Sequence, residues 1–159
     1  MNDSVFTLSR PVTDTEIEQV RQMFREYRQS IGTDLCFQNF EAELATLPGA
    51  YAAPRGRLYL GLSAGKAACC AGLRPCDELA AEMKRLYVRP GYRGHGYGWI
   101  LAKAIIADAT SLGYKKLVLD TLPTMKAAQA MYESLGFRDI EPYTFNPIAG
   151  TRYMGLELQ

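Results

Sequence analysis

The residues best suited to chemistry gather in one stretch, from Glu82 to Gly98, which reads Glu-Met-Lys-Arg-Leu-Tyr-Val-Arg-Pro-Gly-Tyr-Arg-Gly-His-Gly-Tyr-Gly. An apolar-periodic segment from Trp99 to Leu112 follows, so the pattern predicts a strand, a glycine-rich turn and the start of a helix. Glycines let the main chain curl, so that backbone N–H groups converge at the helix N-terminus. Because these amides and the positive end of the helix dipole attract anions, and Arg89 and Arg93 add positive charge, the stretch predicts a phosphate or pyrophosphate site.

Two familiar phosphate-binding loops do not fit these letters. A dinucleotide fingerprint needs Gly-x-Gly-x-x-Gly, but read from Gly94 the last place holds Trp99, and read from Gly96 it holds Leu101. A P-loop needs Gly-Lys followed by Ser or Thr, and the Gly-Lys pair at 65–66 is followed by alanine. The predicted anion site is therefore of another kind.

Length and charge narrow the class of protein. The 159 residues predict a single domain, 1–159, large enough to bury a core. With 18 basic against 17 acidic residues, the net charge of +1 favours neither nucleic acid nor an anionic membrane as partner, and we expect a small or locally charged one. The cysteines form no Cys-x-x-Cys pair and the one histidine, His95, lies in the glycine loop, so no metal site is predicted. Without an export signal or a membrane-length apolar run, we expect reduced thiols and a cytoplasmic location.

The elements that must position this stretch can be read from periodicity. Thr13 to Glu16 has the spacing of a capping box, and apolar residues recur at helical intervals from Ile17 to Ile31 until Gly32. A second helix is predicted from about Asp34, with Phe37, Phe40, Leu44 and Leu47 on one stripe. The remaining predicted elements are an edge strand at 5–8, strands at 58–62, 67–73 and 80–88, helix 98–112, strand 116–121, helix 124–135, and strands 137–140 and 152–158. A right-handed crossover would place strands 80–88 and 116–121 side by side, with the glycine turn at the carboxyl end of the first.

The hexapeptide from Arg93 to Gly98, Arg-Gly-His-Gly-Tyr-Gly, matches the Arg/Gln-x-x-Gly-x-Gly/Ala pattern of the GCN5-related N-acetyltransferases. The segment from Ala127 to Phe137 is similar to that family in the family's order, and the chain resembles it most clearly over residues 80–140. The resemblance implies an α/β (α+β) fold with a mixed, mostly antiparallel sheet of about seven strands flanked by about four helices. It also implies acetyl-CoA as acyl donor, with its pyrophosphate on the glycine turn and its pantetheine arm between strands 80–88 and 116–121.

On this resemblance, the backbone of the strand end pairs with the pantetheine amides as a further strand would, and the amide of Val88 faces the thioester carbonyl. His95 is expected to contribute its backbone amide and not its ring. One position departs from the family, because Met125 stands where many relatives carry an asparagine that bonds the pantetheine arm. The alternative is that the strand residues are plain core. The cofactor-binding residues implied are Leu86, Tyr87, Val88, Arg93, Gly94, His95, Gly96, Tyr97, Gly98, Trp99, Met125 and Ala128.

Two residues match catalytic positions of the family. Tyr132 matches the tyrosine that protonates the departing thiolate, and it shares a predicted helix face with Met125 and Ala128. Glu82 matches the place where several relatives carry a general base, which the reaction needs because amines are protonated at neutral pH. The alternatives are a core tyrosine for Tyr132, and for Glu82 an ion pair with Lys84 or Arg85.

The acceptor is expected to be the primary amine of a small molecule, attacked directly in a ternary complex. The segment 141–150 contains two prolines, and Tyr143, Phe145 and Asn146 could close over the acetyl group as a lid. The alternatives are a loop that only connects two strands, a protein N-terminal or lysine acetyltransferase, and a non-catalytic acyl-CoA-binding sensor. Relatives often pair through their C-terminal strands, so a homodimer is possible.

Overall fold

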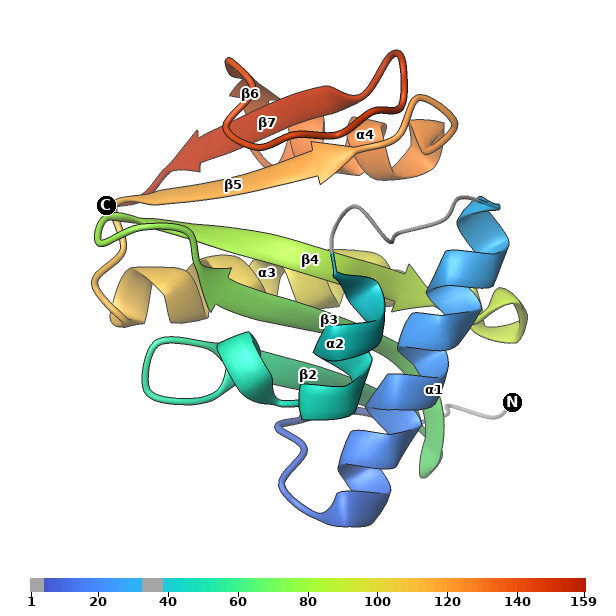
Figure 1. Ribbon diagram of the computed structural model, residues 1–159. Coiled ribbons are helices and arrows are strands. Elements are labelled where there is room, and N and C mark those ends of the chain that lie inside the picture. The colour runs from blue at the N-terminus through green and yellow to red at the C-terminus, as the bar shows by residue number, and fades with distance from the viewer. Residues whose placement is uncertain (1–4, 33–38) are drawn as a thin grey trace.

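A computed structural model of the chain describes residues 5–32 and 39–159 (Figure 1). The described strands form one seven-stranded sheet in the order β1-β2-β3-β4-β5-β7-β6, in which only β4 and β5 pair in parallel. The elements are β1 (Phe6–Ser9), α1 (Asp14–Ile31), α2 (Phe40–Thr46), β2 (Arg57–Ser63), β3 (Lys66–Pro75), β4 (Ala80–Val88), α3 (Tyr97–Ser111), β5 (Lys116–Thr121), α4 (Lys126–Ser134), β6 (Arg138–Asp139) and β7 (Arg152–Glu157). The predicted fold class is confirmed.

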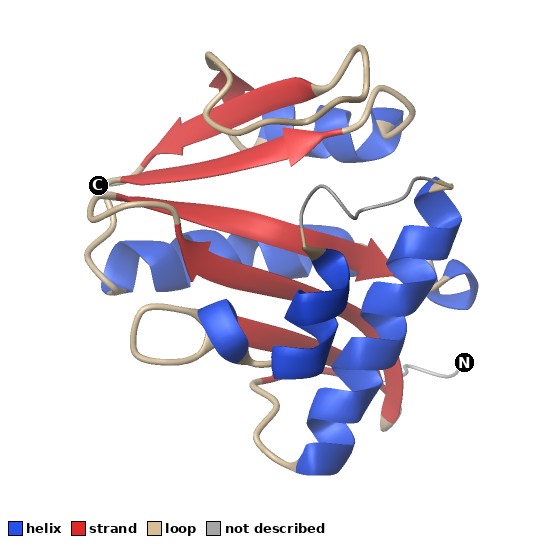
Figure 2. Cartoon of the chain, viewed as in Figure 1, coloured by secondary structure: helices blue, strands red, loops and turns tan. Residues whose placement is uncertain are grey.

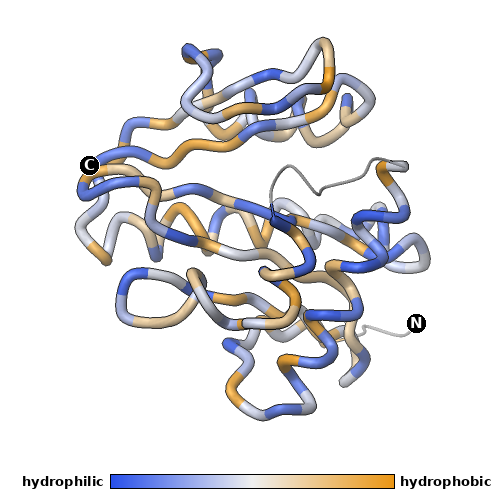
Figure 3. Tube along the Cα trace, in the orientation of Figure 1, coloured by the Kyte–Doolittle hydropathy of each residue, from blue (hydrophilic) through white to orange (hydrophobic). Residues whose placement is uncertain are grey.

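Helices cover both faces of the sheet, α1 and α2 on one side and α3 and α4 on the other (Figure 2). Each side has its own buried apolar cluster: the first includes Phe24 and Phe40, and the second includes Leu101 and Phe137. Hydrophobic and hydrophilic residues are interspersed along α1, as a helix with one buried face requires (Figure 3). Strand β3 is instead buried from Ala67 to Leu73, because helices cover both faces of the sheet. Within the residues of known placement, no helix is long and apolar enough to cross a membrane.

Helix α1 begins and ends as its sequence predicts. The Thr13 side chain accepts a hydrogen bond from the Glu16 amide (3.1 Å), and the Glu16 carboxylate accepts one from the Thr13 amide (3.0 Å). Gly32 closes the helix with φ 64°, a left-handed conformation that costs glycine little. The capping box and the glycine stop are both confirmed.

The second predicted helix is shorter in its described part. Helix α2 begins at Phe40, preceded by Asn39 at φ 56°, and it ends at Thr46. Phe40 and Leu44 are buried as the stripe predicts. The predicted turns around Asp34 and Phe37 lie outside the described residues.

Helix α4 begins later than predicted. The turn in which the Met125 amide bonds the Leu122 carbonyl (3.0 Å) holds the chain out of helical conformation, and Met125 is the N-cap residue with ψ 57°. Met125 therefore precedes the helix that carries Ala128 and Tyr132, instead of sharing its face. The predicted start at Thr124 is wrong for this reason.

Strand β4 contains a bulge that changes which side chains face each helical layer. Arg85 has φ 59°, and the register with β3 shifts between the pairs Gly72–Lys84 and Cys70–Tyr87. A bulge lets two successive side chains share a face. Lys84 and Arg85 accordingly both make ion pairs on the α1/α2 side, with Asp120 and with Glu43.

Candidate active site between β4 and β5

Strands β4 and β5 are paired at one end and separate at the other. Their register contains only the pairs Ala80–Lys116, Ala81–Leu117 and Glu82–Val118, although β4 continues to Val88. Figure 1 shows the two strands diverging toward their carboxyl ends. No described strand pairs with this edge of β4 beyond Glu82, so its backbone groups can bond an extended ligand in the gap.

The glycine turn lies at the carboxyl end of β4 and leads into α3. Gly94 and Gly96 have φ 84° and 79°, and a side chain at either would meet no atom within 4 Å. The first intrahelical bond runs from the Ile100 amide to the Gly96 carbonyl (3.1 Å), so the amides of Tyr97, Gly98 and Trp99 are free of intrahelical partners. The turn therefore presents open space in front of three helix N-terminal amides, as an anion site requires.

The side chains of the turn point in different directions. The Arg93 guanidinium bonds the Val88 carbonyl (2.9 Å) and lies 5.9 Å from the centre of the Tyr87 ring. Tyr97 points into the core, where it stacks on Phe6 at 4.2 Å and donates to Ser63 (3.0 Å). The Tyr97 side chain is therefore not available to a ligand at the turn, and only the Tyr97 backbone can bind one.

Two exposed aromatic side chains lie beside the turn. The His95 ring is 5.7 Å from that of Tyr97, and Trp99 is 41% exposed, with the Lys103 amine 5.8 Å from its ring. The expectation that Arg89 adds charge here is wrong. Its guanidinium pairs with Glu26 of α1 through two bonds (3.0 and 2.9 Å), which neutralise it.

The three predicted backbone contacts on β4 lie along the open edge. Leu86 and Val88 pack toward the α3 cluster, whereas Tyr87 faces α1 and donates to Glu26 (3.4 Å). The side chains of this strand are therefore core, as the alternative predicts, while its backbone borders the gap and the backbone contacts with the cofactor stay a prediction.

Tyr132 lies in α4 and is 7% exposed. Its ring contacts that of Phe137 at 5.6 Å, and Ala128 packs in the same cluster. Burial raises the pKa of the Tyr132 hydroxyl, and among the described residues nothing hydrogen-bonds it. Met125 lies at the head of this helix, where its sulfur accepts from Thr121 (3.7 Å).

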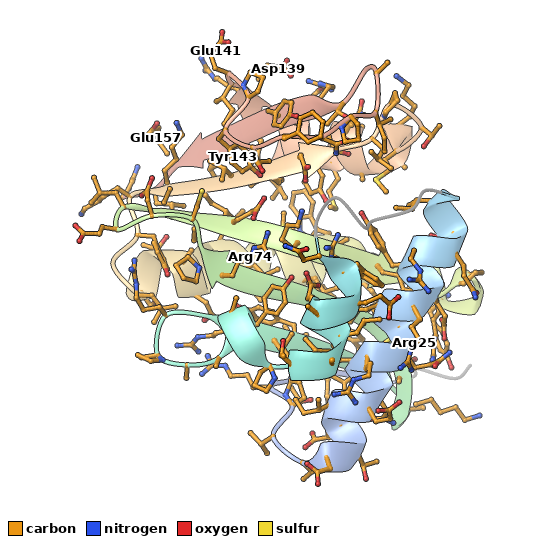
Figure 4. All side chains as sticks on the ribbon, viewed as in Figure 1. Arg25, Arg74, Asp139, Glu141, Tyr143 and Glu157 are labelled. Atoms are coloured by element: carbon orange, nitrogen blue, oxygen red, sulfur yellow. The ribbon has the colours of Figure 1, made fainter. Side chains whose placement is uncertain are left out.

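Glu82 is buried among polar partners on the α1/α2 side of the sheet. Its Oε1 accepts from Arg74 Nε (3.0 Å), its Oε2 accepts from the Tyr143 hydroxyl (2.6 Å), and Lys84 Nζ lies 3.9 Å away. The ion-pair alternative is thus present, although Arg74 of β3 is the main partner. Figure 4 shows Arg74 and Tyr143 on neighbouring parts of this face. Burial and the adjacent Glu82 carboxylate raise the pKa of Tyr143.

Asp120 of β5 forms the second part of the same cluster. Its Oδ1 lies 3.4 Å from Lys84 Nζ, and its Oδ2 accepts from Asn146 Nδ2 (3.2 Å). Burial, together with the neighbouring Arg85 charge, lowers the pKa of Lys84. Two of the three predicted lid residues, Tyr143 and Asn146, therefore contact buried carboxylates.

Phe145 does not take part in this cover. It is 72% exposed and belongs to neither buried cluster, because the loop turns its side chain outward between the anchored residues on either side. The prediction that Phe145 folds inward is wrong.

Arg85 and Glu43 complete the buried charges. Arg85 Nε and Nη2 bond the two oxygens of Glu43 at 3.0 and 3.1 Å, and Tyr51 donates to the same carboxylate (3.1 Å). The guanidinium also lies 5.0 Å from the centre of the Phe40 ring. We call the six ionic residues of this face the buried charge cluster, of which Arg74, 28% exposed, forms the edge: Glu43, Glu82, Asp120, Arg74, Lys84 and Arg85.

A small cavity of about 20 Å³ lies against this cluster, at the end of the β4/β5 gap. Helix α1, both strands and the 141–150 loop contribute to its wall. The lining residues are Tyr27, Ile31, Lys84, Arg85, Asp120, Leu122, Asn146 and Ile148. Burial raises the pKa of Tyr27 to about 12, so its hydroxyl is neutral in ordinary buffers.

A larger cavity, of about 1330 Å³, lies elsewhere, between the N-terminal half of α1 and the segment 47–58. None of the predicted cofactor or catalytic residues lines it. The separation of β4 and β5, and not the size of a hollow, therefore marks the candidate site.

Several residues of this face escape prediction from sequence. Asp120, Arg74 and Glu43 come from three different elements, and only the folded sheet brings them together. A signal for Asp120 does exist, because it is the one acid in the otherwise apolar run Leu-Val-Leu-Asp-Thr of β5.

The comparisons with known proteins agree with this geometry. The model of the acetyltransferase (GNAT) family matches residues 17–137. The chain belongs to the GNAT acetyltransferase family. This GNAT protein is 39% identical over 160 residues to an uncharacterized N-acetyltransferase of Schizosaccharomyces pombe, covering 99% of this chain and 98% of that one. A second relative, an uncharacterized N-acetyltransferase of Dictyostelium discoideum, is 30% identical and covers 83% of this chain and 89% of its own.

Solved structures show the same fold. A GNAT acetyltransferase of Staphylococcus aureus superposes with a TM-score of 0.81 at 20% identity, covering 98% of this chain and 100% of that one. A GNAT acetyltransferase of Elizabethkingia anophelis with acetyl-CoA bound has a TM-score of 0.66 at 21% identity, covering 99% and 100%. Acetyl-CoA is the acyl donor of this family, and the chain is an acetyl-CoA-dependent acyltransferase. The open strand edge and the glycine turn fit that donor.

Proposed function

We propose that this GNAT enzyme acetylates the primary amine of a small molecule by direct attack within a ternary complex. The observation that carries the proposal is the cover that the 141–150 loop forms beside the β4/β5 gap, where Tyr143 donates to Glu82 (2.6 Å) and Asn146 donates to Asp120 (3.2 Å). A loop anchored over the site in this way favours a closed pocket for a compact amine over an open groove for a peptide.

The proposed donor site follows the gap between the strands. The backbone of Leu86, Tyr87 and Val88 holds the pantetheine arm, and the amides at the start of α3 hold the pyrophosphate. Bound there, acetyl-CoA supplies a thioester that is already activated. The chain's own residues then position the amine and move protons.

Tyr132 is the proposed acid. The raised pKa of Tyr132 keeps its hydroxyl protonated at neutral pH. Because no described residue makes a hydrogen bond with this hydroxyl, it can donate its proton to the departing sulfur. It recovers a proton from the nitrogen as the carbon–nitrogen bond forms and the carbon–sulfur bond breaks.

Glu82 is the proposed base that takes the first proton of the ammonium, directly or through a water molecule. Glu82 does not line the small cavity, but Lys84, 3.9 Å from its Oε2, does. Removal of this proton leaves the nitrogen lone pair free to attack, and the proton passes to solvent after turnover.

A protein N-terminus or a lysine side chain is the alternative acceptor. The two classes are separated by offering free amines and short peptides at equal concentrations and comparing kcat/KM from the release of CoA thiol. The proposal predicts a clear preference for free amines. A preference for peptides or intact proteins would contradict it.

We also propose that the protein is cytoplasmic and forms a homodimer. Cys69, Cys70 and Cys76 are free thiols, as the proposed cytoplasmic location favours. Pairing through the C-terminal strands remains a proposal, which the mass of the protein in solution tests directly.

A further inference from the structure

We infer that the large cavity between the N-terminal half of α1 and the segment 47–58 binds a carboxylic acid with an apolar body, and that Arg57 holds its carboxylate. The site lies apart from the β4/β5 gap, so the inference does not depend on the proposed function. It follows from three features of the cavity wall: a guanidinium without a hydrogen-bond acceptor, two guanidinium groups that share one carboxylate, and an apolar surface large enough for an organic ligand.

The cavity is large, and contacts within the fold hold its walls in place. Its volume of about 1330 Å³ exceeds the roughly 300–1,000 Å³ of most ligand pockets, so an organic acid has ample room. On one side, Arg21 of α1 donates to the Leu44 carbonyl (2.8 Å). On the other, Tyr51 is 1% exposed, and a Cβ atom at Gly56 would lie 2.6 Å from the Ala50 carbonyl oxygen. Packing this close leaves the wall formed before any ligand enters.

Arg57, the first residue of β2, supplies the proposed carboxylate site. Its side chain lines the cavity and is 20% exposed. Its Nη1 is buried and has no hydrogen-bond acceptor among the described residues, which is costly for a charged donor. Because no hydrogen bond to a described residue fixes the guanidinium, a small rotation can turn it toward a carboxylate in the cavity, with which it forms charge-assisted bonds.

The charges around Arg57 leave it without a counterion of its own. Its ion-pair partner is Asp108 of α3, whose Oδ2 lies 4.0 Å from Nη1 and accepts a shorter hydrogen bond from Tyr59 (2.7 Å). The Oδ1 of the same Asp108 pairs with Arg10 at 3.5 Å. One carboxylate therefore serves two guanidinium groups, and one further negative charge would balance them.

The other charges of the wall favour a ligand with one negative charge over a ligand with two. Arg21 pairs with Glu18, and Arg89 pairs with Glu26, so both of these guanidinium groups have counterions. Asp14 also lines the cavity, at the start of α1, and it makes no ion pair with a described residue. Because Asp14 would repel a second negative charge, a carboxylate fits better than a phosphate monoester, which carries a charge of about −1.5 to −2 at pH 7.

Apolar side chains supply the site for the rest of the ligand. Ile17, Leu47 and Leu58 line the cavity from α1 and from the segment 47–58. Val12 also lines it and is 82% exposed, so a ligand would remove an apolar side chain from water. Since burial of apolar area drives binding, the ligand is an amphipathic acid and not a small inorganic anion.

The first test compares acids with their neutral amides on the full-length wild-type protein, by calorimetry. The probes are acetate, hexanoate, octanoate and phenylacetate, each paired with its amide. We expect the three larger acids to bind one site about tenfold or more tightly than their amides, as a hydrogen bond to a charged group provides. Octanoate should bind more tightly than hexanoate by about threefold for each added CH₂ group, and acetate should bind weakest. Equal affinity for acid and amide, or no binding of any acid, would overturn the inference.

The second test removes the proposed carboxylate site. In Arg57→Met, the preference for octanoate over its amide should fall to about threefold or less. The melting temperature without ligand should not fall, because the guanidinium that is lost makes no hydrogen bond with a described residue. The matched control is Arg25→Met, which removes an arginine of α1 that pairs with Glu18 and does not line the cavity, and it should leave octanoate binding unchanged. Undiminished preference in the Arg57 variant would overturn the inference.

The third test separates this cavity from the acetyl-CoA site. None of the predicted cofactor residues lines the cavity, so saturating acetyl-CoA should leave the Kd of octanoate within about twofold of its value without acetyl-CoA. Displacement of octanoate by acetyl-CoA would place the acid in the donor site and overturn the inference. If the wild-type protein binds no acid and Arg57→Met changes its mass in solution, this face is instead an interface between two copies of the chain.

Discussion

The two faces of strand β4 differ in kind, one apolar and the other charged. The face toward α3 carries Ala81, Met83, Leu86 and Val88, and the face toward α1 and α2 carries Glu82, Lys84, Arg85 and Tyr87. The first face is stabilised by apolar burial. The second buries charges whose desolvation offsets much of their mutual attraction.

The difference indicates that the apolar face of β4 provides stability and that the charged face provides the chemistry. A buried ion pair contributes little to stability compared with well-packed apolar residues of the same size, so the charges beside the gap need another explanation. Recognition of a charged acceptor and movement of its proton provide one. Substitutions on the two faces should therefore fail in different ways, by lost stability on one and by lost turnover on the other.

The largest effect is expected at the turn that β4 leads into. Gly96→Val puts a β-branched side chain at φ 79° and into the open space before α3, so acetyl-CoA should no longer raise the melting temperature. Gly98→Ala is the control, because its new methyl group would lie 3.8 Å from Leu86 and Met131, an ordinary contact. Undiminished stabilisation of the valine variant by acetyl-CoA would remove the turn from the donor site.

Tyr132→Phe should give the next largest effect. It removes only the hydroxyl, so turnover should fall by about ten- to a thousandfold while the affinity for acetyl-CoA stays nearly unchanged. Steady-state kinetics and calorimetry measure the two quantities. Tyr114→Phe, which loses a bond to the Arg55 carbonyl away from the gap, serves as control. Wild-type turnover in the Tyr132 variant would mean that another group protonates the sulfur.

Glu82→Gln should lower turnover by about ten- to a hundredfold near pH 6 and by less near pH 9. The sign follows from the acceptor, because more of the amine carries a proton at low pH and needs a base. The control is Glu133→Gln, which removes an exposed partner of Arg152. A loss of equal size at every pH would assign Glu82 to holding Arg74 and Tyr143 in place, and not to proton transfer.

Tyr143→Ala tests the cover over the charged face. Loss of the hydroxyl that bonds Glu82 and of the ring that contacts Tyr153 should raise KM for a small amine several-fold, on the order of three- to tenfold. Phe145→Ala changes the same loop at an exposed position and should have no effect. Unchanged kinetics in the Tyr143 variant would reduce the loop to a connection between strands.

The smallest effect on turnover is expected on the apolar side. Leu101 is fully buried in the α3 cluster, so Leu101→Ala should lower the free energy of unfolding by about 2–5 kcal/mol, measured with denaturant. Turnover per folded molecule should not change. A specific loss of turnover at full folding would show that the two faces are not independent.

Sequence patterns predict the elements of this fold well, because capping residues, periodicity and glycines act locally. Thr13, Gly32 and the limits of β5 all illustrate this. The crossover rule also predicts that strands 80–88 and 116–121 are neighbours, whereas the gap between them is implied only by the resemblance to the family. Local patterns thus predict the strands and the glycine turn beside the gap.

The acceptor side depends on contacts between distant elements, which no local pattern encodes. The bulge at Arg85, a left-handed residue that is not glycine, turns Lys84 and Arg85 to one face, and alternation alone would separate them. Glu43 and Arg85 are 42 residues apart, and Tyr143 and Glu82 are 61 apart. Only the folded sheet shows that these residues share one cluster.

The most direct test of acetyl transfer at this site is the release of CoA thiol by the wild-type protein with acetyl-CoA and a panel of small primary amines. The account predicts release that depends on the amine and equals the amount of N-acetylated product found by mass spectrometry. A protein that binds acetyl-CoA but releases no thiol with any amine, peptide or protein acceptor would contradict it.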